Sequence, residues 1–92
     1  MVAYERVRKA IGREIRRQRI AAKLTQQELA ARIHTSGAYV GRVERGVTNL
    51  TAQEFVRIAV AIGTDPVQLL GRVTEGRGEE RAQKRGVKNR RS

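Results

Sequence analysis

The sequence predicts an all-α fold: a compact bundle of five helices in residues 1–71, followed by a flexible basic tail in residues 72–92. Three observations lead to this prediction. Apolar residues recur at spacings of three and four, which is the period of a helix with one buried face. No segment alternates apolar and polar residues with a period of two, as a half-buried strand would. Aromatic residues make up only 3% of the chain, so aliphatic side chains have to build the core.

The first helix is predicted from an apolar stripe near the N-terminus. The stripe consists of Tyr4, Val7, Ile11, Ile15 and Ala22, with Gln18 interrupting it. Six arginine and lysine residues of this segment lie largely off the stripe, so we expect them to face solvent. The segment contains no apolar core of a secretory signal, and no apolar run of the chain is long enough to span a bilayer.

Two similar stretches, "LTQQEL" at 24–29 and "LTAQEF" at 50–55, predict the starts of the second and fourth helices. Thr25 and Thr51 are placed to cap the free N–H groups of the first turn. Glu28 and Glu54 follow three residues later and complete a capping box. The fourth helix is expected to stop at Gly63, because glycine is the usual residue after a helix end.

The third helix is predicted to start at the cap Ser36, to bury Val40 and Val43, and to end at Gly46. A fifth, short helix is predicted from Asp65 to Gly71. Its Pro66 falls in the first turn, where the missing N–H does no harm.

Only about three residues, "HTS", join the second and third helices. Two short helices joined so tightly cross steeply, which is the helix-turn-helix arrangement. Ala30 is small enough to let the two backbones approach, and His34 falls where a left-handed backbone is expected. His34 is the only histidine and the chain has no cysteine, so we predict neither a metal site nor a cofactor.

The formal net charge of +11 points to a polyanionic partner, with nucleic acid favoured over an anionic membrane surface. Residues 1–71 carry twelve basic and six acidic residues, and residues 72–92 carry eight and three. Both parts are therefore basic. The acidic residues of the body have structural positions, and no pair of carboxylates, Ser–His arrangement or phosphate-cradling loop remains. We therefore predict that the protein is not an enzyme.

The stretch from "LTQQELAARI" through "VERG" to "DPVQLL" resembles the XRE, or Cro-like, family of helix-turn-helix transcription regulators over residues 11–71. Within that family, "AYVGRVERGVTNLT" is similar to restriction-modification controller proteins and small regulators of mobile elements. The resemblance implies a lambda-repressor-like five-helix fold, a homodimer, a palindromic operator and control of its own promoter. It also implies a bacterial or phage protein in the cytoplasm, associated with the nucleoid through DNA. The sequence departs from the family pattern at His34, where glycine is usual, and at Gly37, where a long polar side chain is common.

The third helix is expected to read DNA. Small residues at Gly37, Ala38 and Gly41 would let its backbone approach base edges, so that Arg42 can contact a guanine. The alternative is that these glycines are merely tolerated. Tyr39 is expected to donate its hydroxyl to a phosphate, unless its ring packs on a neighbouring element. The complete set of candidate DNA contacts is Gln26, Gln27, Thr35, Ser36, Gly37, Ala38, Tyr39, Arg42, Arg45, Thr48 and Asn49.

The family resemblance further implies a partly buried salt bridge between Arg19 and Glu44, and a bracing role for Gln26. A two-fold dimer is predicted through apolar residues at the end of the chain's body. These residues are Ile62, Val67, Leu69, Leu70 and Val73. The predicted partners are double-stranded DNA and a second copy of the chain, with RNA polymerase or a small partner protein as further candidates.

Two other readings of function remain open. One is an antitoxin-like protein-interaction module that binds DNA only for autoregulation. The other is an architectural or RNA-binding protein that uses charge without reading sequence.

Overall fold

The computed structural model describes residues 2–73, and within this range it contains helices and no strands. The helices are α1 (Val2–Ala21), α2 (Gln26–Arg32), α3 (Gly37–Arg45) and α4 (Ala52–Ile62). A further helical segment covers the described residues 66–73. The predicted all-α fold of five helices is therefore confirmed. The flexible tail predicted beyond residue 73 lies outside the described residues. Within the described part, no helix is both long and apolar enough to cross a bilayer.

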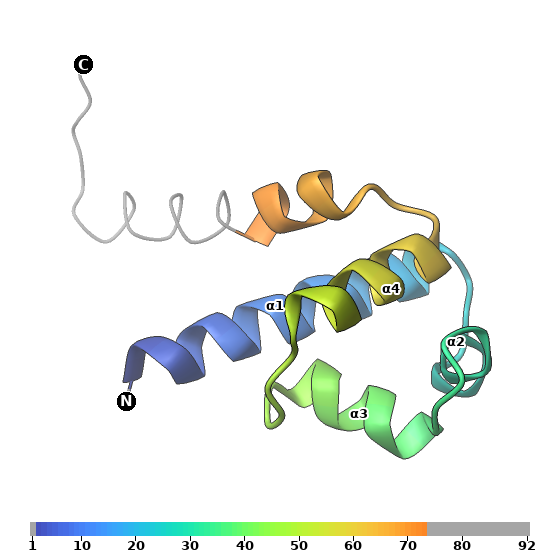
Figure 1. Ribbon diagram of the computed structural model, residues 1–92, viewed down its shortest axis with the longest axis horizontal. Coiled ribbons are helices and arrows are strands. Elements are labelled where there is room, and N and C mark those ends of the chain that lie inside the picture. Colours follow the sequence, from blue (N-terminus) through green and yellow to red (C-terminus); the bar gives the residue numbers. More distant parts are fainter. Residues whose placement is uncertain (1, 74–92) are drawn as a thin grey trace.

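The elements stack so that α3 and the 66–73 segment lie on opposite sides of α1 and α4 (Figure 1). The core between them consists of aliphatic side chains from every helix. Its buried members are Ile15, Leu29, Ala30, Ile33, Val40, Val43, Ile58, Ala59, Ile62 and Leu69. Because α3 packs against both α1 and α2, its orientation is set by two neighbours rather than by the turn alone.

The helix starts predicted from sequence are confirmed. The Glu28 N–H donates to the Thr25 hydroxyl, and the Thr25 N–H donates to the Glu28 carboxylate. Thr51 and Glu54 repeat this capping box at the start of α4. Each box satisfies two N–H groups that would otherwise lack partners in the first turn. The two ends predicted at glycine are also confirmed, since Gly46 and Gly63 adopt left-handed φ angles of 74° and 94°.

The predicted end of the fifth helix at Gly71 is wrong. Residues 72 and 73 are helical, and Gly71 does not adopt the positive φ seen at Gly46 and Gly63. Glycine ends a helix only where the backbone turns left-handed, and elsewhere it is tolerated inside the helix at a cost of about 1 kcal/mol relative to alanine. The Asp65 cap of this helix is present, because its carboxylate accepts from the Val67 N–H at 2.7 Å.

The apolar stripe predicted on the first helix is only partly buried. Ile15 is fully buried, but Tyr4 is 70% exposed and Val7 38% exposed. The reason is that the first turns of α1 extend beyond the ends of α3 and α4 (Figure 1). Tyr4 is therefore largely uncovered, and Val7 is covered only in part.

The residues predicted to form the dimer interface fall into two groups. Ile62, Leu69 and Val73 are buried within a single chain, at 8%, 0% and 5% exposure. They hold the 66–73 segment against the core, so the prediction that they face a partner needs correction. Val67 and Leu70 lie on the outer face of the same helix and are exposed at 78% and 48%.

Candidate nucleic-acid interface

The turn between α2 and α3 determines how the chain enters α3. His34 has a φ of 59°, which confirms the left-handed backbone predicted there. The Thr35 N–H then donates to the Ala30 carbonyl at 2.9 Å, and Ser36 caps α3 by accepting from the Tyr39 N–H at 3.1 Å. Thr35 and Ser36 are exposed beside the start of α3.

A buried ion pair seats α3 on α1. Arg19 donates from Nε and Nη2 to the two carboxylate oxygens of Glu44, at 2.6 and 3.0 Å, so the predicted Arg19–Glu44 salt bridge is confirmed. Its third contact is a hydrogen bond of 2.7 Å to the Leu24 carbonyl. The hydrogen bond to Glu44 raises the pKa of Arg19 above its ordinary value. Two parallel bonds fix direction as well as distance, so this pair holds α3 at one angle to α1.

Gln26, at the start of α2, joins the same cluster. Its Nε2 donates to Glu44 Oε1 at 3.1 Å, so α2 is tied to α3 through the carboxylate that also binds α1. This is the bracing role implied by the family resemblance. A phosphate contact from Gln26 could use its backbone N–H at the helix start or the second N–H of its side-chain amide, because Glu44 accepts only one of the two.

The exposed side of α3 and the start of α2 enclose a shallow hollow of about 330 Å³. The hollow is lined by Gln26, Gln27, Gly37, Ala38, Gly41, Arg42 and Arg45. Six of these seven residues are candidate DNA contacts from the sequence. Small residues, two glutamines and two exposed arginines line it together, which is a shape and charge that suit the edge of a polyanion.

Neither glycine of α3 is fully exposed, although both were expected to leave the helix backbone open to base edges: Gly41 is buried and Gly37 half-buried. A Cβ on Gly41 would lie 3.3 Å from Arg45 Nη1 and 3.7 Å from Gln26 Oε1. A Cβ on Gly37 would lie 3.3 Å from the Gln27 carboxamide carbon. The glycines therefore make room for Gln26 and Gln27 to lie close to α3.

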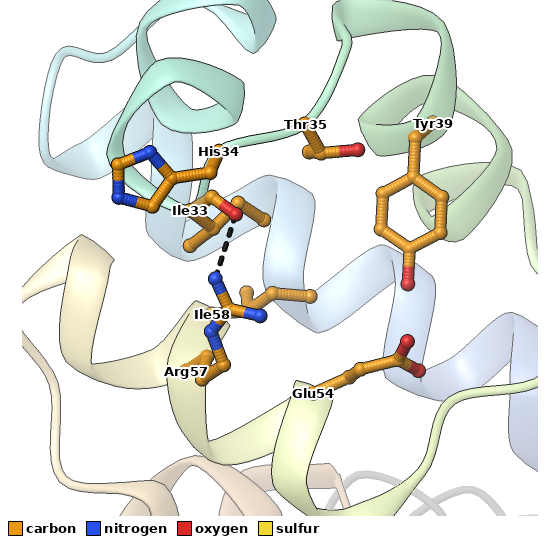
Figure 2. Close-up of a pocket in the computed structure, with 7 residues that line it drawn as sticks. All are labelled: Ile33, His34, Thr35, Tyr39, Glu54, Arg57 and Ile58. Carbon is orange, nitrogen blue, oxygen red and sulfur yellow. Dashed lines mark hydrogen bonds between the residues drawn. The ribbon is translucent and has the colours of Figure 1, made fainter.

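Tyr39 does not face outward. Its ring packs against the core, and its buried hydroxyl reaches no hydrogen-bond partner among the described residues. The hydroxyl points toward the Glu54 carboxylate at the start of α4 (Figure 2). Burial, followed by the negative charge of Glu54, raises the pKa of Tyr39 above its ordinary value. This placement contradicts the expected phosphate contact, because a buried hydroxyl is not available to a phosphate.

The loop after α3 is held by α1. Arg8 donates to the Gly46 carbonyl at 3.3 Å and to Asn49 Oδ1 at 3.1 Å. Asn49 is exposed and Thr48 half-buried. The side-chain N–H₂ of Asn49 keeps its donors, because Arg8 uses only the oxygen.

Two contacts that position α2 and α3 were not predicted from the sequence. Gly12 lies where α1 crosses α3, and a Cβ there would come within 2.5 Å of the carbonyl oxygens of Val43 and Glu44. Arg57 of α4 donates to the Ile33 carbonyl at 2.8 Å, which satisfies the end of α2. The sequence did contain a signal for Gly12. A glycine in the middle of a strong helical pattern usually marks a place where another element packs closely.

The sequence of the chain matches a known protein family. The model of the helix-turn-helix domain family matches residues 10–70. The chain belongs to that family. In this helix-turn-helix domain, α2 and α3 are the two helices of the motif, and α3 occupies the place of the recognition helix.

Individual relatives of this helix-turn-helix protein are regulators. The control protein C.BamHI of Bacillus amyloliquefaciens is 28% identical over 76 residues, covering 82% of this chain and 94% of the relative. The restriction-modification controller protein C.AhdI of Aeromonas hydrophila is 33% identical, with a TM-score of 0.66 over 72% of this chain and 94% of that one. The clp gene regulator ClgR of Corynebacterium glutamicum shares the fold, with a TM-score of 0.78 at 24% identity over 85% of this chain and 83% of that one. The chain is thus an XRE-like helix-turn-helix regulator that resembles controller proteins.

Proposed function

We propose that this protein is a sequence-specific regulator of transcription that binds a palindromic operator in double-stranded DNA as a homodimer and controls its own promoter. The observation that carries the proposal is the surface of α3. Small residues and glutamines form its hollow, and Arg42 and Arg45 stand exposed beside it. Arginine is the side chain that most often recognises guanine, through a bidentate contact in the major groove.

The rigid seating of α3 supports sequence reading rather than charge-driven binding alone. Readout of base edges needs side chains held in one register relative to the groove. The Arg19–Glu44–Gln26 cluster ties α3 to both α1 and α2 through buried bonds. A protein that binds only by charge needs no such constraint, because counterion release depends on the number of phosphates contacted and not on their register.

Exposed apolar side chains support the homodimer. Val56 and Val60 on α4, and Val67 and Leu70 on the 66–73 helix, are each at least 42% exposed. Several exposed apolar residues in one part of a small protein favour an interface with another copy. The controller relatives are bacterial proteins, and we place this regulator in the bacterial cytoplasm, acting on DNA near its own gene.

Selection from duplexes with a randomised central region tests the function. The protein should enrich an inverted repeat whose half-sites are centred about one helical turn apart, roughly 34 Å. Enrichment of no sequence, with equal affinity for all duplexes, would contradict sequence-specific regulation.

Sedimentation tests the assembly separately. Leu70→Glu places a charge on the exposed face of the 66–73 helix and should convert the dimer to a folded monomer. Ile20→Glu is the matched control, because Ile20 is also 48% exposed but belongs to α1. A dimer that persists in Leu70→Glu, or that is lost equally in Ile20→Glu, would refute the proposed interface.

A further inference from the structure

A cavity of about 190 Å³ lies between the helix-turn-helix turn and the start of α4 (Figure 2). Its lining residues are Ile33, His34, Thr35, Tyr39, Glu54, Arg57 and Ile58. The ring of Tyr39 extends from α3 along one side of this cavity, with its hydroxyl directed at the Glu54 carboxylate. A tyrosine in this position connects the recognition helix to α4, which the motif itself does not include.

Tyr39 also contacts the arginine expected to read DNA. The guanidinium carbon of Arg42 lies 5.8 Å from the centre of the Tyr39 ring, one helical turn further along α3. A cation above an aromatic face within about 6 Å is attracted to it. The Arg42 guanidinium makes no hydrogen bond or ion pair with any described residue, so within residues 2–73 the Tyr39 ring is the contact that restricts this long side chain.

The far end of Tyr39 faces a group that is itself fixed. Glu54 belongs to the capping box of α4, and its Oε1 accepts from the Thr51 N–H at 3.0 Å. The Tyr39 hydroxyl is directed at this carboxylate, and the negative charge of Glu54 contributes to the raised pKa of Tyr39. We therefore expect the backbone of α4, and not only α3, to determine the orientation of the ring.

We propose that Tyr39 is a positioning residue for base recognition: Glu54 orients its ring, and the face of the ring directs Arg42 toward the hollow on α3. This inference rests on the proposed function, in which Arg42 contacts a base. An arginine that is already ordered loses less side-chain freedom when it binds, so its contact contributes more to discrimination between bases. Tyr39 thus acts on specificity through Arg42, without touching DNA through its hydroxyl.

The test compares base preference in a small set of variants. Selection with randomised duplexes is first run on the parent and on Arg42→Ala, which identifies the base pair that Arg42 reads. Tyr39→Leu removes the ring and should weaken the preference at that base pair about two- to fivefold, which corresponds to an exposed cation–π contact. Affinity for scrambled duplex should stay unchanged.

Three further variants separate the parts of the mechanism. Tyr39→Phe keeps the ring and should retain the larger share of the preference. Glu54→Gln keeps a capping-box side chain but removes the negative charge, and it should cause a smaller loss at the same base pair. Tyr4→Leu is the matched control, because Tyr4 is 70% exposed on the overhanging end of α1. It should change nothing.

The outcomes are distinct. A Tyr39→Leu variant that loses affinity equally for selected and scrambled DNA, or loses preference evenly over all positions, would show a merely structural role and overturn the inference. If Tyr39→Leu does not fold, nuclear Overhauser contacts between the Arg42 side chain and the Tyr39 ring in the free parent decide. Their presence supports the stack, and their absence overturns it. A parent that selects no sequence would instead refute the proposed function.

Discussion

Replacing Gly12 by alanine tests how α3 is seated against α1. The added Cβ would lie 2.5 Å from two backbone oxygens, those of Val43 and Glu44. Backbone atoms cannot swing aside, so α1 and α3 must separate or tilt. Such overpacking commonly costs about 1–3 kcal/mol, and contacts this short belong at the upper end. Alanine regains about 1 kcal/mol of helix propensity, so the net loss is about 2 kcal/mol.

Thermal unfolding by circular dichroism measures this effect. For a domain of this size a loss of 1 kcal/mol lowers the melting temperature by about 4–8 °C, so Gly12→Ala should lower it by about 10 °C or more. Gly71→Ala is the matched control, because Gly71 is also helical but a Cβ there meets nothing within 4 Å. It should raise the melting temperature by a few degrees. If both variants were stabilised alike, the close crossing at Gly12 would be refuted.

Three other predictions follow from the same contacts and from the charge of the chain. Arg19→Met leaves the buried Glu44 without its ionic partner and should lower the free energy of unfolding by about 3–5 kcal/mol in denaturant titration. Replacing both partners by methionine should restore much of the loss, and an unchanged single variant would contradict the pair. In a Tyr4→Phe background, ultraviolet titration should show the pKa of Tyr39 above its ordinary value of about 10. The folded state then keeps this proton to higher pH than the unfolded chain, so the free energy of unfolding should fall as pH rises above about 10 through that pKa. A pH-independent stability in this range would argue against burial of the hydroxyl. Deleting residues 74–92 should weaken binding to all duplexes alike and flatten the dependence on salt, whereas a loss confined to the operator would show that the tail reads sequence.

Local chemistry made the element boundaries predictable. Thr25 and Thr51 indicate helix starts, because a capping box needs only a hydroxyl and a carboxylate three residues apart. His34 marked the turn because few residues tolerate a left-handed backbone. The Arg19–Glu44 pair followed from a family pattern rather than from spacing in the sequence.

Features that depend on packing between distant segments were not predictable in the same way. Leu69 and Leu70 are adjacent leucines that the sequence does not distinguish. Only the placement of the 66–73 helix decides that Leu69 is buried and Leu70 exposed. The Tyr39 hydroxyl points toward Glu54, which lies fifteen residues later on another helix. Gly41 looked exposed by helical periodicity, but Arg45 and the Gln26 side chain of α2 cover it.

Specific binding of DNA by α3 through Arg42 can be tested by one comparison of affinities. The affinities of the parent, Arg42→Ala and Arg13→Ala are measured at one salt concentration on the selected duplex and on a scrambled one. Arg13 is an exposed arginine of α1 and supplies the matched loss of charge. Arg42→Ala should weaken binding to the selected duplex by about 1–3 kcal/mol, roughly 5- to 150-fold, with little change on scrambled DNA. An equal loss on both duplexes, or an equal loss in Arg13→Ala, would contradict specific recognition of DNA through Arg42.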